Sequence, residues 1–299
     1  MAVKNRTESV LRRLKNRSKE TGISFQVTLQ LFAQEEFLRK LSKSEYSKYF
    51  VLKGGMFVYT LTHFETRPTR DTDLMIREYP LNQEQIKTVM NEICRIETGN
   101  DFITFEILRT GDISLDKPYP GVKTWLMGHV NNVRIPFSVD IGVDDIIIPS
   151  PVRRELSTLL PDFESPELYT YSLESTIAEK LDAILSRMSG TSRMKDFYDI
   201  YFLSELFDFD GTILRDSVSA TLKHRGRIMT EEMVDEIHSF PDNTYLQIRW
   251  NAFEPAVKSG LLFSKTVERM MAFLKPVCIS IIRNENFCLH WNCTDGKWI

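Results

Sequence analysis

The spacing of apolar residues along the chain predicts helices at the N-terminus, then mixed strands and helices, and then a helical second half. Val10, Leu11 and Leu14 mark a first helix, and apolar positions return near helical spacing through 27–41. Ser24 precedes that second run and is a residue type that caps helices, so we expect the second helix to begin directly after it.

After these helices the pattern changes to short apolar runs that are typical of strands. Asn131-Asn132 separates two of the longer runs, and such a pair between strand-like segments predicts a β-hairpin. In chain order the expected elements are a strand at 50–52, a helix at 56–63, a strand at 73–76, a helix at 81–97, and strands at 102–107, 123–130 and 133–143.

The segment Pro149-Ser150-Pro151 interrupts the chain, and the residues beyond it have a mostly helical pattern. We therefore predict an α+β protein with two lobes, divided within 149–166. Residues 1–150 would form a lobe of mixed β-sheet and helices, and residues 151–299 a mainly helical C-terminal lobe. A chain of 299 residues is long enough to bury a substantial core.

Composition favours a cytoplasmic protein without membrane association. No run of about eighteen apolar residues occurs, and the basic N-terminal segment lacks the apolar stretch of a secretory signal. Cys94, Cys278, Cys288 and Cys293 show no framework spacing, which favours a reduced compartment. Cys288 and Cys293 flank His290, but a fourth ligand is missing, so we favour packing of this tail over a metal site.

The distribution of charge is more informative than its total. The formal net charge of −3 argues against a uniformly basic nucleic-acid-binding protein. The first twenty residues nevertheless carry seven Lys and Arg against two Glu, and a second basic run lies at 223–227. Such patches would bind nucleic-acid phosphates, although on charge alone a solvated helix face is the slightly better explanation for the N-terminal one.

Asp71 and Asp73 are the first candidates for chemistry. In a strand, residues two apart share a face and lie roughly 7 Å apart at Cα. Two carboxylates at that range repel each other unless a cation lies between them. Oxygen-only ligands suit Mg²⁺, which shares its coordination with substrate phosphates. The pair therefore indicates a site for Mg²⁺ and a nucleoside triphosphate (NTP).

A glycine pair precedes these carboxylates. Gly54-Gly55 allows backbone N–H groups to approach a phosphate, and the helix that follows presents the positive end of its dipole. Arg67 and Arg70 lie beside the Asp pair and would contact a triphosphate. Each signal alone is weak, because Gly-Gly is usually a turn and Asp-x-Asp is common on surfaces. Their strand–turn–helix–strand order makes the combination more specific.

Asp140 is the natural third carboxylate. It lies within the apolar strand predicted at 133–143, where a charged residue requires a reason. A strand beside the Asp pair would bring Asp140 to the same site, as two-metal phosphoryl transfer requires. The alternative is a carboxylate at a strand end that faces solvent.

A second cluster falls in the helical half. Lys180 lies on the apolar face of a helix predicted to begin after Ser172, where an ammonium is costly unless it is paired or contacts a ligand. Asp196 and Asp199 share a face of the next helix, which Arg193 opens. We predict a direct catalytic role for Lys180, with Asp196 paired either to it or to Arg193. An ion pair that braces two helices is the alternative, and the two roles are compatible.

In their order and spacing these residues resemble the four sequence blocks of AbiEii-type nucleotidyltransferase toxins, the toxin halves of bacterial abortive-infection and related toxin–antitoxin pairs. The matching segments, within roughly residues 25–205, are Lys53-Gly54-Gly55, Arg67-x-Thr69-x-Asp71-x-Asp73-Leu74, Val139-Asp140-Ile141-Gly142, Glu179-Lys180-Leu181-x-Ala183 and Arg193-x-Lys195-Asp196-x-x-Asp199. The wider superfamily usually has Gly-Ser at the glycine pair, and Thr69 stands where this family more often has Ser.

The resemblance implies a polymerase-β-like nucleotidyltransferase lobe followed by a helical C-terminal lobe. It also implies a Mg²⁺-dependent enzyme that uses NTP and is controlled by a cognate antitoxin encoded nearby. Some members of the family add nucleotides to the 3′ end of tRNA, so the implied acceptor is RNA. The implied residues are Asp71, Asp73, Asp140, Lys180 and Asp196 for catalysis, Asp71, Asp73 and Asp140 for the metal, and Gly54, Gly55, Arg67 and Thr69 for the nucleotide.

Other interpretations use part of the same pattern. A nucleotidyltransferase that modifies small molecules such as aminoglycosides needs the Asp pair but no basic surface. A catalytically silent module that binds a nucleotide or a partner needs no intact site, yet all three strand carboxylates are present. A sugar-nucleotide glycosyltransferase also uses Asp-x-Asp but has a larger doubly wound sheet, against which the helical second half argues.

Overall fold

The computed structural model describes residues 2–79, 82–113, 121–143, 145–257 and 259–299. These residues form two compact units. Unit 1 comprises Met1–Asp144 and Val152–Thr170, and unit 2 comprises Asp145–Pro151 and Tyr171–Ile299. The predicted lobes, 1–150 and 151–299, stay a prediction about folding domains, because compactness does not establish that either unit folds alone.

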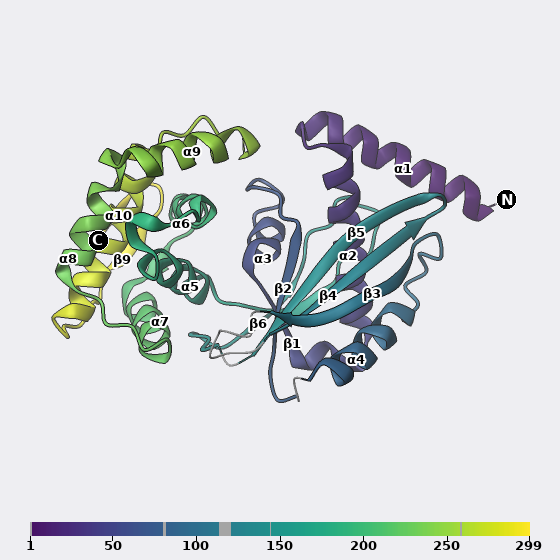
Figure 1. Cartoon of the computed structure of the whole chain (residues 1–299), viewed down its shortest axis with the longest axis horizontal. Helices are drawn as coiled ribbons and strands as arrows, with labels where there is room; N and C mark the ends of the chain where they lie inside the picture. Colours follow the sequence, from purple (N-terminus) through teal and green to yellow (C-terminus); the bar gives the residue numbers. More distant parts are fainter. Residues whose placement is uncertain (1, 80–81, 114–120, 144, 258) are drawn as a thin grey trace. The chain divides into compact units, whose positions relative to one another are not determined.

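A seven-stranded mixed sheet forms the centre of unit 1 (Figure 1). Its strands are β1 (Phe50–Lys53), β2 (Asp71–Ile76), β3 (Thr104–Ile113), β4 (Gly121–Val130), β5 (Val133–Gly142), β6 (Val152–Glu155) and β7 (Glu167–Thr170), in the spatial order β3-β4-β5-β2-β1-β7-β6. β2 is parallel to β5 and β1 is parallel to β7, whereas the other neighbouring pairs are antiparallel.

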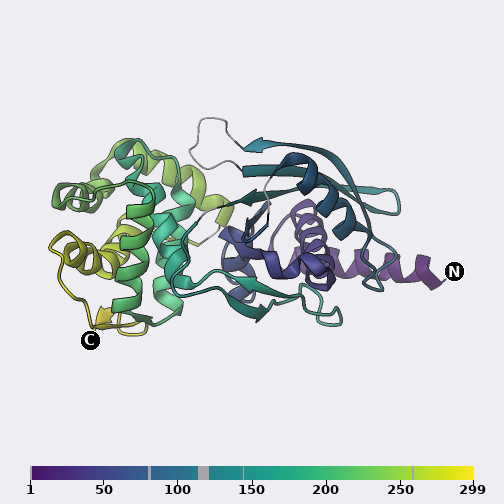
Figure 2. The same cartoon turned by 90° about the horizontal axis from the view of Figure 1, so that it is seen from below.

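Helices cover one face of this sheet. They include α2 (Phe25–Lys43), which packs on β5, and α4 (Gln83–Arg95), which packs on β3 and β4 and touches α2 (Figures 1 and 2). α1 (Ala2–Thr21) contacts α2, and α3 (Gly54–Leu61) contacts β1 and β2. A short 3₁₀ helix, η1 (Glu45–Tyr49), leads into β1. As predicted, Ser24 caps α2, and its side chain accepts a hydrogen bond from the Val27 N–H at 3.3 Å.

The burial pattern of the hairpin strand β4 shows which face of the sheet α2 covers and which face is left uncovered. Along β4, Val122, Thr124 and Leu126 are buried, whereas Lys123 and Trp125 are only partly covered. The buried series faces α2, since a Cβ atom placed on Gly128 would lie 3.6 Å from the Ala33 Cβ. Because side chains alternate along a strand, Lys123 and Trp125 project from the opposite face of the sheet.

Unit 2 is mainly helical. Its principal elements are α5 (Leu173–Leu185), α6 (Met194–Leu206), α7 (Gly211–His224), α8 (Glu231–Ser239), α9 (Thr244–Val257), α10 (Phe263–Ile282) and a small sheet of β8 (Phe209–Asp210), β9 (His290–Asn292) and β10 (Lys297–Trp298). Trp291 is 1% exposed and Trp298 stacks on Phe273, so the predicted packing of the C-terminal tail is confirmed. None of the helices in the described part of the chain has the length and apolar character that a membrane crossing requires.

Most predicted elements are present, although β2 begins at Asp71 instead of 73, and β3 runs from Thr104 to Ile113 instead of 102–107. The strands β6 and β7 were missed, because four-residue segments are too short for their alternation to be recognised. The helix predicted at 56–63 begins at Gly54. The predicted start of the next helix at Leu81 lies outside the described residues, and α4 is seen from Gln83.

A buried network of charges holds α2 in place beneath the sheet. Arg39 donates hydrogen bonds to the carboxylates of Glu36 and, at 2.6 Å, Glu35, and all three side chains are buried. The Leu159 N–H donates to Glu35 at 2.6 Å, and the Asn100 amide donates to Glu36 at 2.8 Å. α2 is thereby tied to two loops that are distant in the sequence.

This network has a consequence for stability at different pH. Burial raises the pKa of Glu35 from 4.5 to about 7, against the opposing effect of Arg39. The folded protein therefore holds this proton more tightly than the unfolded chain, and the resulting stability is lost as pH rises from 4.5 to about 7. We expect this group to lower the free energy of unfolding by on the order of 3 kcal/mol across the window. Glu35→Gln should remove that part of the pH dependence in urea denaturation.

The exposed Glu8→Gln variant is the matched control for this experiment, because its carboxyl lies in α1 at the surface. It should keep the wild-type pH profile. Identical profiles for Glu35→Gln and the wild type would show that Glu35 does not hold a proton in the folded protein.

Candidate active site

Strand register brings charged residues into one row across unit 1. Lys53 on β1 pairs with Asp73 on β2, Asp73 pairs with Asp140 on β5, and Asp140 pairs with Lys123 on β4. Paired residues on adjacent strands project from the same face of a sheet. The row therefore has two carboxylates at its centre and a lysine on each side.

A second row lies two residues further along the strands, on the same face. It contains Asp71 on β2, Ser138 on β5, Trp125 on β4 and Arg109 on β3. The Ser138 hydroxyl donates a hydrogen bond to the Asp71 Oδ1 atom at 3.2 Å. Asp71, Asp73 and Asp140 thus share one face on two neighbouring strands, with Asp71 more exposed than Asp140.

The structure adds a residue that the sequence analysis did not single out. The Lys123 Nζ atom lies 3.0 Å from Asp140 Oδ1 and 3.8 Å from Asp71 Oδ1, so it joins the two rows. A signal for it was present, because a hairpin with a two-residue turn at Asn131-Asn132 pairs position 123 with position 140.

The electrostatics of Asp140 test whether a divalent cation fits here. Burial raises the pKa of Asp140, Lys123 lowers it, and the charges of Asp73 and Asp71 raise it again. The Asp140 Oδ1 atom is buried and accepts no hydrogen bond of normal geometry from the described residues, although Lys123 Nζ is within ion-pair distance. A buried carboxylate oxygen with an unused lone pair, beside two further carboxylates, suits a hard cation.

The donor atoms are not arranged as a finished metal site. Among the described residues, no group of three His, Cys, Asp or Glu side chains stands in a metal-binding arrangement. The cation that offsets part of the carboxylate repulsion in the structure is the Lys123 ammonium. The oxygen-only donor set nevertheless fits Mg²⁺, which requires few protein ligands because it retains waters and binds phosphate.

The glycine pair lies directly against these carboxylates. Gly54 has φ +66°, and a Cβ atom at this position would lie 2.2 Å from Asp73 Oδ2. A Cβ atom at Gly55 would lie 2.8 Å from the Thr69 hydroxyl oxygen and 3.6 Å from Arg67 Nη2. Both positions therefore require glycine, and the first turn of α3 approaches Asp73, Thr69 and Arg67 closely.

Of the remaining predicted residues in unit 1, Thr69 is buried, and its hydroxyl donates to the Asp71 carbonyl oxygen at 3.3 Å. Arg67 is partly buried beside the glycine pair. Arg70 is exposed, and its carbonyl oxygen accepts a hydrogen bond from the Gln30 side chain at 3.0 Å. Arg67 therefore lies at the glycine turn, whereas the Arg70 backbone contacts Gln30 of α2.

Lys180 and Asp196 belong to unit 2, where they form a buried cluster between α5 and α6. Lys180 Nζ lies 2.5 Å from Asp199 Oδ2 and 3.6 Å from Asp196 Oδ1. Asp196 is bound more closely by Arg193. The predicted pairing of Lys180 with Asp196 is thus the weaker of two contacts, and Asp199 is the residue that holds Lys180. The buried Lys180 ammonium and the partly exposed Arg193 guanidinium thus offset the two buried carboxylates.

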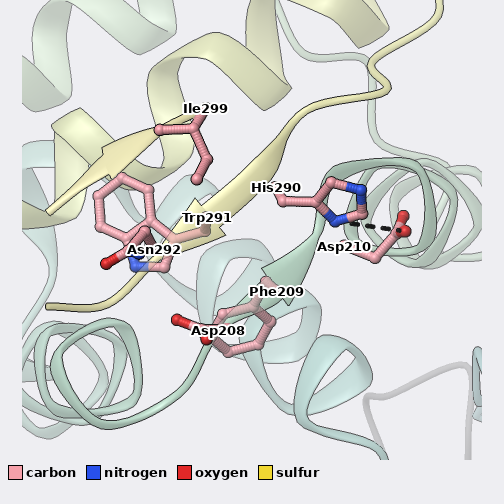
Figure 3. A pocket seen from close by; sticks show the side chains of 7 residues that line it. All are labelled: Asp208, Phe209, Asp210, His290, Trp291, Asn292 and Ile299. Atoms are coloured by element: carbon pink, nitrogen blue, oxygen red, sulfur yellow. Dashed lines mark ion pairs between the residues drawn. The ribbon is translucent and has the colours of Figure 1, made fainter. Parts of the chain in front are cut away.

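Two further features of unit 2 bear on the sequence analysis. Arg225 forms an ion pair with Asp145 and Arg227 with Asp182, so the basic run at 223–227 is largely engaged within the unit. A shallow cavity of about 270 Å³ lies at the small C-terminal sheet (Figure 3). Its lining contains none of the predicted site residues and consists of Asp208, Phe209, Asp210, His290, Trp291, Asn292 and Ile299.

The contact between Gly54 and Asp73 can be tested through stability. Gly54→Ala combines an unfavourable positive φ with a clash against Asp73, whereas Gly99→Ala has the same backbone problem at φ +73° with nothing within 4 Å. We expect Gly54→Ala to lower the free energy of unfolding by about 1–3 kcal/mol more than Gly99→Ala does, measured by denaturant unfolding. Equal losses would mean that α3 does not press against Asp73.

Comparisons with solved structures bear on the fold of the chain. JHP933 from Helicobacter pylori superposes with a TM-score of 0.51 at 11% identity, covering 87% of this chain and 95% of that chain. A second Helicobacter pylori structure, described provisionally as a nucleotidyltransferase, gives a TM-score of 0.49 at 12% identity, over 89% of this chain and 100% of that one. At such identities the JHP933 likeness concerns the fold alone, and it confirms the predicted α+β class. A search of the curated proteins finds no match.

The family comparison is more specific. The model of the AbiEii nucleotidyl transferase toxins, of type IV toxin–antitoxin systems, matches residues 36–269 and so covers most of the chain, including both clusters of predicted site residues. This chain therefore belongs to the AbiEii nucleotidyltransferase toxin family.

Proposed function

We propose that this nucleotidyltransferase uses Mg²⁺ and an NTP to add nucleotides to the 3′ end of tRNA in the cytoplasm, and that its cognate antitoxin restrains that reaction. The observation that carries the proposal is the strand register that gathers Asp71, Asp73 and Asp140 on the open face of the sheet. Such a cluster of carboxylates beside a glycine turn is what nucleotidyl transfer requires.

In this mechanism Asp71 and Asp73 would hold Mg²⁺, with Asp140 ligating a second ion or accepting the proton of the acceptor hydroxyl. When bound, the metal supplies positive charge that stabilises the phosphates during transfer. Ser138 keeps Asp71 oriented through its hydrogen bond. Lys123 stabilises the carboxylates against one another before substrate binds.

The glycine turn would bind the triphosphate. Neither Gly54 nor Gly55 adds a Cβ atom of its own at the start of α3, which would let a phosphate approach the backbone N–H groups there. Arg67 and the Thr69 hydroxyl lie beside the turn and would donate to phosphate oxygens. Lys180 of unit 2, held by Asp199 and Asp196, would neutralise charge as pyrophosphate leaves.

The exposed charge of α1 supports a polyanionic acceptor over a small molecule. Arg6, Arg13 and Arg17 are anchored by contacts within unit 1. Arg12, Lys15 and Lys19 are exposed on the same helix and form no ion pair with the described residues. Cations that stabilise nothing within the fold are suited to bind the phosphates of a nucleic acid.

The proposed reaction is tested by end-labelling purified tRNA with each of the four NTPs in turn. We expect label in tRNA with at least one NTP, and a loss of at least about 100-fold in rate for Asp71→Asn or Asp73→Asn, because each removes a carboxylate charge from the site. Asp112→Asn, which neutralises an exposed carboxylate on the edge strand β3, is the matched control and should keep the wild-type rate. Label in a panel of small molecules but not in RNA would overturn the choice of acceptor.

A catalytic role of Lys180 and a structural role in bracing two helices can be tested separately. Lys180→Met leaves Asp199 and Asp196 buried with one cation fewer, so we expect about 3–5 kcal/mol of lost stability. The double variant Lys180→Met, Asp199→Asn removes the charge imbalance and should recover more than half of that loss in denaturant unfolding. It should not recover nucleotide transfer. Wild-type transfer by the double variant would show that Lys180 is a structural brace alone.

A further inference from the structure

The open face of the sheet in unit 1 continues past the carboxylates onto β4 and β3. Trp125 lies on this face, in register with Ser138 on one side and with Arg109 on the other. Two strand spacings separate Trp125 from Asp71 in the same row, which is about 10 Å between Cα atoms. The indole thus lies on the same face of the sheet as the carboxylates. Its distance from Asp71 is comparable to the length of one nucleotide.

The surroundings of Trp125 make a planar, positively charged surface. The Arg109 guanidinium carbon lies 3.9 Å from the centroid of the indole ring, and Lys123 Nζ lies 5.8 Å from it. A Cβ atom at Gly111 would lie 3.3 Å from the Trp125 Cζ3 atom, so a glycine on β3 gives the ring room to lie across that strand. Arg109 is exposed and Trp125 is partly exposed.

The position of this stack relative to the glycine turn decides which substrate it would meet. In the sheet order the carboxylates of β2 and β5 lie between β1, which ends at the glycine turn, and β4, which carries Trp125. Nucleotidyl transfer places the attacking and leaving oxygens roughly in line, on opposite sides of the reacting phosphorus. A triphosphate bound at Gly54-Gly55 therefore directs the acceptor towards β4 and β3.

We propose that Trp125 and Arg109 form a stacking platform for a nucleobase at the reacting end of the acceptor. Aromatic rings and guanidinium planes both stack on nucleobases, and this contact tolerates any base because every base has a flat π face. The two cations beside the ring add attraction for the acceptor phosphates. The platform rests on the proposed function in one respect: it identifies the acceptor as a polynucleotide with an unpaired end.

A purely structural role for the stack makes different predictions. If Arg109 only covers the indole, then replacing Trp125 changes stability and leaves substrate affinities alone. If the platform binds a base, Trp125→Leu raises the KM for tRNA by roughly 10-fold with little change in the KM for NTP. Trp125→Phe keeps a ring and should stay within about threefold of the wild type. Arg109→Lys keeps the charge without the plane and should give an intermediate effect.

The matched control is Tyr79→Leu. Tyr79 is a partly exposed aromatic residue of unit 1 whose ring contacts those of Tyr46 and Tyr49, beyond the end of β2 that is remote from Asp71. Removing it should leave both KM values unchanged. Thermal unfolding of every variant separates a loss of affinity from a loss of fold.

A binding experiment without chemistry completes the test. A short single-stranded oligoribonucleotide is titrated against the full chain while intrinsic tryptophan fluorescence is followed. We expect quenching in the wild type that is absent in Trp125→Phe, together with roughly 10-fold weaker binding for Trp125→Leu, measured by anisotropy of a labelled oligonucleotide. Unchanged tRNA KM and unchanged oligonucleotide affinity in Trp125→Leu would overturn the platform, and so would a rise in the NTP KM alone.

Failure of this proposal is distinguishable from failure of the proposed function. If the wild type labels tRNA but Trp125→Leu does so with an unchanged KM, the platform is wrong and the function stands. If the wild type labels no RNA yet binds the oligonucleotide through Trp125, the tRNA-labelling function is wrong and the platform stands.

Discussion

The repulsion among three carboxylates on one face of a sheet is the constraint on which the site in unit 1 depends. Register places Asp73 beside Asp140 and sets Asp71 two residues away, so the repulsion cannot be relieved by turning a side chain to the other face. Lys123 offsets part of it from β4, and Lys53 completes the row from β1. Strand pairing, and not a loop, brings Lys123 to these carboxylates, and we propose that this arrangement prepares them for a divalent metal.

The rest of unit 1 is arranged around that face. α2, fixed by the buried network of Arg39 with Glu35 and Glu36, covers the opposite side of the sheet and leaves the carboxylate side open. The glycine pair lets α3 begin in contact with Asp73, where any side chain would displace a carboxylate. The glycine turn proposed to bind phosphate, the carboxylates and the proposed Trp125 platform follow one another across the strands, in the order that an in-line transfer would require.

The sequence predicted the parts of this arrangement that depend on local pattern. The Asn131-Asn132 hairpin, the capping residues Ser24 and Ser172, and the spacing of Asp71 and Asp73 are all short-range signals, and each element is present. The features that the sequence did not predict depend on pairing between residues that are distant in the chain. Lys123 becomes a site residue only through its register with Asp140, and Asp199 binds Lys180 more closely than Asp196 because of how α5 and α6 pack. The strands β6 and β7 carry too few residues to show a period.

The central claim is that Asp71, Asp73 and Asp140 jointly bind a divalent cation with the triphosphate. Its most direct test is Mn²⁺ binding, followed by electron paramagnetic resonance in the presence of a non-hydrolysable NTP analogue. We expect saturable binding by the wild type and at least about 10-fold weaker binding when any one of the three residues is changed to Asn, since each change removes a charged oxygen ligand. Wild-type Mn²⁺ affinity in all three variants would contradict the account.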